Sequence, residues 1–151
     1  LMAQPVVEAL KVALADTFTF YLKAHYFHWN VQGPDFKQYH DLFGGIWEEV
    51  FGAVDSLAEF IRTMGSYAPG TLGRFKELTT LVELETVPEA REMVLALAVD
   101  NAKVLQSIRT AFTESENAGA HAVANFLQDR LAAHEKHGWF LHSTLGNNVN
   151  D

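Results

Sequence analysis

The sequence predicts an all-α fold in which four long helices form a bundle with one long crossover. The first observation is a stretch over 6–31 without glycine or proline, which favours a long helix. The second is a set of apolar residues that recur every three or four positions over 40–62. The third is a loop-like segment over 65–87, rich in glycine and threonine. The 151 residues suit one domain, which we expect to span 1–151.

We expect the first helix over 5–31, because Pro5 suits the first turn of a helix. The second helix is expected over 35–64, where Asp35 and Gln38, three residues apart, form an N-capping pattern. The apolar residues of this segment follow one helix face: Phe43, Trp47, Val50, Val54, Leu57 and Ile61.

The crossover and the last two helices follow. Within the crossover, the sequence RFKELTTL predicts a short extra helix. The third helix is expected over 88–116, with Thr86 and Glu89 as a capping pair around its start. The fourth helix is expected over 120–145, just before a glycine that suits a helix end.

Short first and last connections around one long crossover are the connectivity of a ferritin-like four-helix bundle. Bundles of this class that hold a di-iron centre within one chain use a Glu-x-x-His motif. No glutamate of this sequence is followed by histidine at the third position. We therefore expect no di-iron centre of that type inside one chain.

The composition excludes several other functions. The net charge of −8 and the pI near 5.3 argue against a bare nucleic-acid binder and suit a protein that handles cations. The absence of cysteine excludes disulfides and thiolate metal sites. The first residues lack the pattern of a signal peptide, and no apolar run approaches the roughly 20 residues that span a bilayer. A cytoplasmic location is the default expectation.

Two pairs of metal-ligand side chains lie on the first helical hairpin. The turn QGP should fold the chain back and place His28 beside His40. Asp55 and Glu59 are one helical turn apart and share a face. If the second helix is unbroken, His40 and Asp55 point within roughly 60° of each other but lie roughly 22 Å apart along the axis. Ligand bonds of about 2.0 to 2.2 Å cannot span that gap.

One chain therefore cannot close the site, but two chains can. If two hairpins pack antiparallel about a twofold axis, the histidines of one face the carboxylates of the other, and two equivalent sites form. Three glycines support close packing of this helix against another: Gly44, Gly45 and Gly52. Each costs about 1 kcal/mol relative to alanine inside a helix. We interpret them as small residues that allow two helices to approach closely.

Three segments carry a resemblance to a known family: FHWNVQGPDFKQYH, DSLAEFIR and LAAHEKHGWFLHSTL. On these segments the sequence resembles the Dps family, the mini-ferritins or DNA-binding proteins from starved cells, over essentially the whole chain. The resemblance implies iron storage and detoxification under oxidative stress. It also implies a hollow dodecamer that oxidises Fe(II), preferentially with hydrogen peroxide or otherwise with O₂, and stores the ferric mineral.

The resemblance further implies a ferroxidase site between two subunits. His28 and His40 correspond to the histidine ligands from one subunit, and Asp55 and Glu59 to the carboxylates from the other. Trp29 corresponds to the tryptophan beside that site. A di-iron centre is implied, and zinc is the alternative metal, because imidazole and carboxylate ligands accept several divalent ions.

The sequence departs from the family pattern at two places. Many members carry an acidic residue four positions after the second histidine, where this chain has Gly44, and a lysine three positions before the first histidine, where it has His25. Together these changes suggest His25 as a further metal ligand, with a histidine at the interface as the alternative. The family's acidic iron-entry pore corresponds to a stretch that offers no carboxylate and these polar residues: Asn117, His121 and Asn125.

Other histidines and acids allow two interpretations. The spacing of His134 and His137 invites a metal site, but no carboxylate cluster joins them at a suitable offset, and His142 adds none. We expect packing roles for all three. A second set either faces a cavity and nucleates mineral or forms a solvated helix face: Asp41, Glu48 and Glu49.

Two other functions compete with iron oxidation. Some family members compact DNA through lysine-rich tails, but this sequence has no lysine or arginine before Lys11 or after Lys136, so we expect no DNA binding. The other is a helical oligomer whose site holds structural zinc. A salt-dependent gel shift would reveal the first, and peroxide-driven Fe(II) oxidation would exclude the second.

Overall fold

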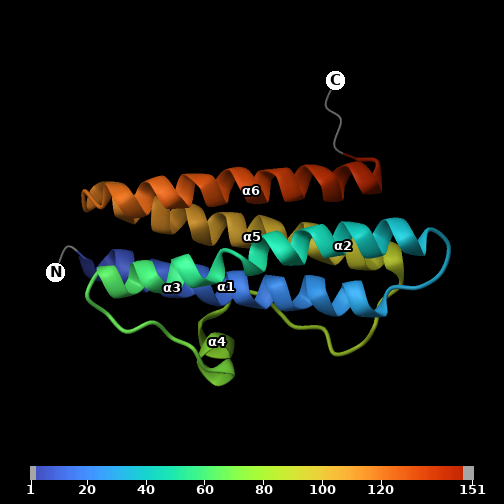
Figure 1. Ribbon diagram of the computed structural model, residues 1–151, viewed down its shortest axis with the longest axis horizontal. Coiled ribbons are helices and arrows are strands. Elements are labelled where there is room, and N and C mark those ends of the chain that lie inside the picture. Colours follow the sequence, from blue (N-terminus) through green and yellow to red (C-terminus); the bar gives the residue numbers. More distant parts are fainter. Residues whose placement is uncertain (1–2, 148–151) are drawn as a thin grey trace.

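The computed structural model describes residues 3–147, which form six helices and no strand. The helices are α1 (Ala3–Asn30), α2 (Phe36–Phe51), α3 (Val54–Thr63), α4 (Leu72–Leu78), α5 (Ala90–Asn117) and α6 (His121–Leu145). Helices α1, α5 and α6 and the arm formed by α2 and α3 are the four rods of one bundle, with the short α4 beside it (Figure 1). The predicted all-α, ferritin-like bundle with a short extra helix in its crossover is confirmed.

The core lies where α1 meets its neighbours. Helix α1 packs against α2, α3, α4 and α5, and α5 packs against α6. Phe20 and Phe27 of α1 are fully buried, and the ring of Phe27 lies 6.1 Å from that of Phe43 on α2. Each such side chain contributes roughly 1.5 to 3 kcal/mol of burial free energy. This packing fixes the α1–α2 hairpin that carries both histidines.

The predicted second helix over 35–64 is two helices rather than one. Helix α2 ends at Phe51, and α3 begins after Gly52 and Ala53. The backbone N–H of Ala53 donates to Val50 O at 3.0 Å, which is one residue short of the α-helical pattern. Glycine is a poor helix former, and the interruption falls at its position. The rotation between His40 and Asp55 therefore departs from that of an ideal helix.

The reversal between α1 and α2 uses two left-handed residues. Gly33 has φ 101° and Asp35 has φ 64°. Asp35 occupies the predicted N-cap position of α2, but its side chain makes no capping hydrogen bond, so the expected pairing with Gln38 is not formed. The left-handed backbone turns the chain instead, and it brings the end of α1 against the start of α2.

The remaining helix ends differ from prediction by a few residues. Helix α1 begins at Ala3, α5 begins at Ala90 and α6 begins at His121. The N-cap of α5 is Glu89, which makes no side-chain capping bond, so the predicted capping pair with Thr86 is absent. Helix α6 ends as expected, at a glycine with φ 77°.

The crossover is tied to the bundle by buried polar groups. Asp16 of α1 is fully buried and accepts hydrogen bonds from Thr79 Oγ1 (2.6 Å), Thr80 N (2.7 Å), Thr80 Oγ1 (2.8 Å) and Ser107 Oγ (2.5 Å). Lys23 of α1 provides a second tie, because its Nζ donates to the carbonyl oxygen of Val82 in the crossover at 2.7 Å and also pairs with the buried Asp100 of α5. These contacts hold the crossover against α1 and α5.

Within residues 3–147, no helix combines the length and the apolar character needed to cross a membrane.

Candidate metal centre

His28 and His40 meet across the α1–α2 hairpin. His28 lies in the last turn of α1, and His40 lies in the second turn of α2. Their rings stack with centroids 3.7 Å apart and an interplanar angle of 18°. Both side chains are half-buried. The two histidines that the sequence placed side by side therefore lie in direct contact.

The backbone carbonyl of each histidine determines which ring nitrogen of the other histidine carries the proton. His28 Nδ1–H donates to the carbonyl oxygen of His40 at 2.7 Å, and His40 Nδ1–H donates to that of His28 at 2.8 Å. A carbonyl only accepts, so both rings carry their proton on Nδ1 when neutral. Nε2 of each ring then presents a bare lone pair. Metal-binding histidines commonly have their other N–H held in this way.

Asp55 and Glu59 form an exposed carboxylate pair on α3. A hydrogen bond to Asp55 raises the pKa of Glu59 above its usual value, and the negative charge of Asp55 adds to this effect. A cation bound between the two would favour the ionised form of both. The pair is therefore suited to receive a positive ion.

The two pairs are not brought together within the chain. Across residues 3–147, no three side chains among histidine, aspartate and glutamate lie close enough to hold one metal ion. His28 and His40 lie on the α1–α2 hairpin, and Asp55 and Glu59 lie beyond the helix break on α3. A shared site between two chains thus stays a prediction.

His25 is held in an aromatic stack beside the pair. Its ring lies 3.9 Å from that of Trp47 at an interplanar angle of 11°, and 4.1 Å from that of Trp29. Tyr21 Oη lies 3.0 Å from His25 Nδ1. Burial lowers the pKa of His25, and the charge of His28 lowers it further. A neutral imidazole can bind a metal, but its centroid is 6.0 Å from that of His28, so its role as a ligand also stays a prediction.

Two tryptophans lie near the histidines: Trp29, which the resemblance points to, and Trp47. The role of Trp29 beside the metal site stays a prediction. Trp29 is 59% exposed and stacks on His25. Trp47 is half-buried, and its ring lies 6.3 Å from that of His28. Trp47 looked like a packing residue in the sequence. Its position two helical turns after His40, on the same face, is the signal that could have placed it here.

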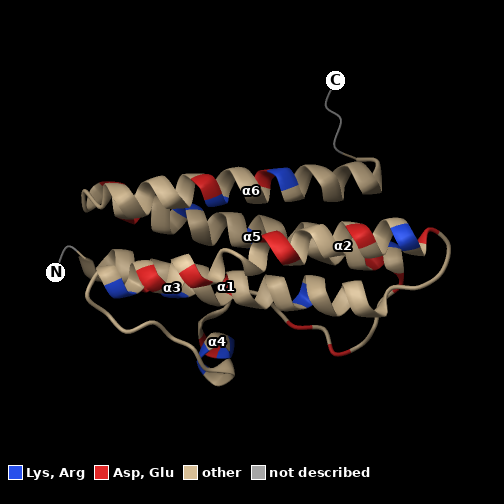
Figure 2. Ribbon diagram, viewed as in Figure 1, with Lys and Arg blue, Asp and Glu red and all other residues tan. Residues whose placement is uncertain are grey.

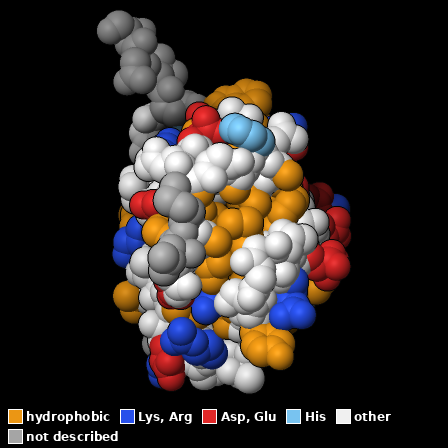
Figure 3. All heavy atoms as spheres, turned by 90° about the vertical axis from the view of Figure 1, so that its left-hand side faces the viewer, with side chains coloured by type: hydrophobic (Ala, Val, Ile, Leu, Met, Phe, Trp, Pro, Cys, Tyr) orange, Lys and Arg blue, Asp and Glu red, His pale blue; other side chains and the backbone are white. Residues whose placement is uncertain are grey.

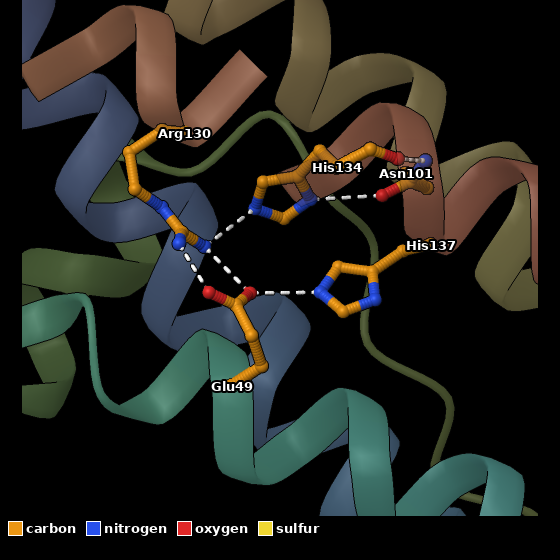
Figure 4. Close-up of polar contacts among 5 residues, drawn as sticks. All are labelled: Glu49, Asn101, Arg130, His134 and His137. Carbon is orange, nitrogen blue, oxygen red and sulfur yellow. Dashed lines mark hydrogen bonds and ion pairs between the residues drawn. The ribbon is translucent and has the colours of Figure 1, made fainter. Parts of the chain in front are cut away.

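A second polar cluster joins α2, α5 and α6 (Figure 4). Arg130 is buried and forms a two-pronged ion pair with Glu49, at 2.5 and 3.1 Å. His137 Nε2–H donates to Glu49 at 2.8 Å. His134 Nδ1–H donates to Asn101 Oδ1 at 2.8 Å, while Asn101 Nδ2 donates to the carbonyl of His134 at 2.8 Å. Arg130 Nη2 donates to the remaining nitrogen of His134 at 3.3 Å.

This cluster explains the histidines of α6 as interior polar groups. Burial lowers the pKa of His134 well below its usual value, and the charges of Arg130 and His137 add to the effect. Burial acts to raise the pKa of Glu49, but hydrogen bonds and positive charge from His137 and Arg130 outweigh it and hold that pKa well below its usual range. His142 lies apart, 3.1 Å from Asn147 Oδ1. The only signal for Arg130 in the sequence is its position one helical turn before His134.

The acids proposed to face a cavity have different surroundings. Glu49 is engaged by Arg130 and His137, and Asp41 pairs with Lys37 at 2.7 Å. Glu48 is exposed. The role of this set in mineral nucleation stays a prediction, and Glu49 has strong competing partners.

The predicted pore stretch lies at the end of the bundle where α5 passes into α6. Asn117, His121 and Asn125 are all exposed there. Figure 3 shows this end of the molecule, where apolar side chains gather at the centre with a histidine at the edge. The surface offers amide and imidazole groups, and Glu116 is the exposed carboxylate nearest to them in the sequence.

Comparison with known proteins decides the family. The sequence profile of the Ferritin-like domain matches residues 7–148. The DNA protection during starvation protein of Brevibacillus brevis is 32% identical over 142 residues, covering 94% of this chain and 95% of the relative. The chain belongs to the ferritin-like Dps family.

Solved structures of Dps proteins have the same fold. The Dps protein from Bacillus brevis superimposes with a TM-score of 0.90 at 31% identity, covering 95% of this chain and 97% of that one. The Dps from Staphylococcus aureus gives 0.89 at 31% identity, covering 94% and 95%. As a Dps protein, this chain falls in the general class of mini-ferritins that serve iron storage or DNA protection.

Proposed function

We propose that this Dps protein oxidises Fe(II) at sites shared between two subunits, with hydrogen peroxide or O₂ as oxidant, and stores ferric mineral in a hollow dodecamer. One observation carries the proposal. His28 and His40 keep their Nε2 atoms bare, while Asp55 and Glu59 form an exposed carboxylate pair elsewhere on the same arm. Each pair is half of a ligand set for iron.

The two halves would divide the chemistry. The imidazoles accept Fe(II) without adding charge, and the carboxylates favour the more highly charged ferric product. Two Fe(II) ions give one electron each to one hydrogen peroxide, which takes up two protons and leaves as two waters. The chain's own contribution is to hold the irons and to fix the protons of His28 and His40 on Nδ1.

Exposed apolar side chains support assembly with further subunits. Trp29 is 59% exposed, Leu72 of α4 is 73% exposed, and Tyr67 in the crossover is 83% exposed. Leu22, Trp29 and Leu84 line one pocket, and apolar side chains that gather in a surface patch are typical of sites that another chain covers. The Dps relatives likewise favour an oligomer.

DNA compaction is not favoured by the charges of the chain. The net charge is −8, and phosphate repels such a protein unless a basic segment offsets it. In the view of Figure 2, acidic and basic positions are interspersed along the helices, and the crossover before α5 carries acidic ones. A gel shift at several salt concentrations tests this directly, and we expect no shift.

Substitution of Asp55 tests the proposed activity. Fe(II) is added to the protein under anaerobic conditions, and hydrogen peroxide then starts the oxidation. We predict that Asp55→Ala slows this oxidation by at least about 10-fold, because loss of a metal ligand should cost at least as much activity as loss of a group that orients a ligand. Absorbance of the ferric product follows the rate, and size-exclusion chromatography checks assembly.

The matched control is Asp129→Ala. Asp129 is also an exposed aspartate within a helix, but it lies on α6, which carries neither half of the proposed site. We expect native rates from this control. Equal rates for the native protein and Asp55→Ala would show that the carboxylate pair is not the catalytic centre. Zinc retention without any iron oxidation by the native protein would favour a structural site.

A further inference from the structure

A group of aromatic rings lies beside the histidine pair. The imidazole of His25 contacts two indoles, with ring centroids 3.9 Å from that of Trp47 and 4.1 Å from that of Trp29. The Trp47 ring also lies 6.3 Å from the ring of His28 and 6.0 Å from that of Tyr21. Because the chain has no cysteine, indole and phenol are the side chains that lose one electron most easily. Trp47 therefore connects the histidine half of the proposed metal site to an oxidisable tyrosine.

The indole of Trp47 has no way to lose its proton. Its Nε1 is buried, and no acceptor in the described part of the chain, residues 3–147, lies within hydrogen-bond distance. An indole that loses one electron becomes a cation, and it turns neutral by giving up the proton on this nitrogen. A charge held in the interior without a partner is costly. An oxidised Trp47 therefore keeps its charge and draws an electron from a neighbouring side chain.

Tyr21 is placed to supply that electron. Its Oη lies 3.0 Å from Nδ1 of His25, the separation at which a base takes a proton. The phenol donates along this contact when the proton of the neutral imidazole is on Nε2. An oxidised phenol is a strong acid, so its proton passes to the imidazole even though burial lowers the pKa of His25. Tyr21 can lose an electron and a proton together, and Trp47 cannot.

We propose that Trp47 and Tyr21 form an electron relay, in which Tyr21 is the side chain that is finally oxidised. A single Fe(II) that reacts with hydrogen peroxide gives Fe(III), hydroxide and hydroxyl radical. The hydroxyl radical takes one electron from Trp47 and becomes hydroxide. Oxidised Trp47 takes one electron from Tyr21, whose phenol proton moves to Nδ1 of His25. The products are hydroxide, a neutral tyrosyl radical and an imidazolium, so charge and atoms balance.

The source of the oxidant rests on the proposed function, but the contacts that form the relay belong to the fold. The first test therefore uses metal-free protein with Trp29→Phe and Trp139→Phe, which leaves Trp47 as the only indole. Azidyl radicals from pulse radiolysis oxidise indole in preference to phenol. We expect the tryptophan radical to decay as a tyrosyl radical grows, at a rate independent of protein concentration. Adding Tyr21→Phe should abolish this growth.

The matched control in the same background is Tyr26→Phe. Tyr26 is a half-buried tyrosine of the same helix, and its ring lies 5.6 Å from that of Phe27. We expect tyrosyl growth to be unchanged in this control. A third variant, His25→Phe, keeps an aromatic ring in the group but removes the proton acceptor. Its tryptophan radical should persist, which tests the relay with Tyr21 intact. Circular dichroism checks the fold of each variant.

The second test uses the iron reaction itself. Hydrogen peroxide is added to protein that holds less than one Fe(II) per chain, and the samples are frozen for electron paramagnetic resonance. We expect a tyrosyl signal from the native protein and from Tyr26→Phe. The signal should be lost in Tyr21→Phe, which lacks the terminal donor, and in Trp47→Phe, which lacks the connection to it.

The outcomes separate the relay from the proposed function. Tyrosyl growth that Tyr21→Phe leaves unchanged in the metal-free protein would overturn the inference, and so would a peroxide-driven tyrosyl signal that Trp47→Phe leaves unchanged. A working relay in the metal-free protein, together with no oxidation of Fe(II) by peroxide in the native protein, would instead refute the proposed function and leave the relay intact.

Discussion

At the scale of single residues, hydrogen-bond partners decide which ring nitrogen of a neutral histidine carries the proton. His28 and His40 are each fixed by a backbone carbonyl, and His134 is fixed by Asn101. The first two leave a nitrogen bare at a half-buried surface. The third gives its remaining nitrogen to Arg130 in the interior. The same residue type thus serves as a candidate ligand at one place and as a structural group at another.

His134 should make the fold sensitive to mild acid. Its folded pKa is lowered by burial and by neighbouring positive charge, so it stays neutral in the folded state while the unfolded chain takes up a proton below about pH 6.5. The contribution of His134 to the free energy of unfolding is therefore fully present above that pH and is lost as the pH falls below it. The slope is at most about 1.4 kcal/mol per pH unit for one proton.

Urea unfolding at pH 7.0 and 5.5 checks this prediction. We expect His134→Gln to be less stable than the native protein at the higher pH and to lose less stability on acidification. His142→Gln is the control, because His142 is an exposed histidine of the same helix. An unchanged pH dependence in His134→Gln would contradict the prediction.

Glu49 adds a second acid-sensitive group at lower pH. Its folded pKa is depressed by His137 and Arg130, so its contribution is present above the unfolded value of about 4.3 and is lost as the pH falls through the folded value. The two windows do not coincide. The pKa of His25 is also lowered, so the share of His134 in the loss at pH 5.5 is the difference between the native protein and His134→Gln.

At the scale of elements, the crossover is anchored by one carboxylate. Asp16 is fully buried and gathers four hydrogen bonds, three of them from Thr79 and Thr80 and one from Ser107. The crossover also carries α4, whose Phe75 ring stacks on that of Phe18 at 4.9 Å. Asp16 therefore fixes the path of the segment that links α3 to α5.

Removal of this carboxylate should loosen the crossover. We predict that Asp16→Ala lowers the free energy of unfolding by about 3 kcal/mol, because the four hydrogen bonds that this buried carboxylate accepts are lost together. Ser107→Ala removes one donor and should cost about 1 kcal/mol. Hydrogen exchange should become faster at the Thr80 amide in the first variant and stay slow in the second. Native protection of that amide in Asp16→Ala would show that other contacts hold the segment.

The presence of each long helix could be predicted from the sequence more reliably than its breaks and its capping hydrogen bonds. The bundle and the extra helix over the RFKELTTL region were predicted from the spacing of apolar residues and the positions of glycine and proline, and both are present. The break at Gly52 and Ala53 was not predicted, because the apolar spacing continues through it. Both expected capping patterns were wrong, because the left-handed backbone at Asp35 and the extended one at Glu89 start their helices without side-chain caps.

At the scale of the whole molecule, the proposed metal site is the part for which residues 3–147 of one chain bring no three ligands together. The spacing of His28 and His40 across a short turn was enough to predict their contact. Their reciprocal bonds to backbone carbonyls could not be predicted, because these depend on how closely α1 approaches α2. The Glu49–Arg130 pair was likewise beyond prediction, since it joins residues 81 positions apart. Such contacts depend on how the helices pack against one another, and the spacing of apolar residues in the sequence does not determine that packing.

The central claim is that each site takes its histidines from one subunit and its carboxylates from another. Two inactive variants test it: one with His28→Ala and His40→Ala, the other with Asp55→Ala and Glu59→Ala. Each assembled alone should lack rapid peroxide-driven Fe(II) oxidation.

The measurement is the oxidation rate after the two variants are unfolded together and reassembled as a mixture. Random pairing about a twofold axis makes half of the pairs mixed and leaves one intact site in each, so about a quarter of the native rate should return. Variants refolded separately and then combined without exchange are the control, and they should stay inactive. A mixture that also stays inactive, with its assembly intact, would contradict a site shared between subunits.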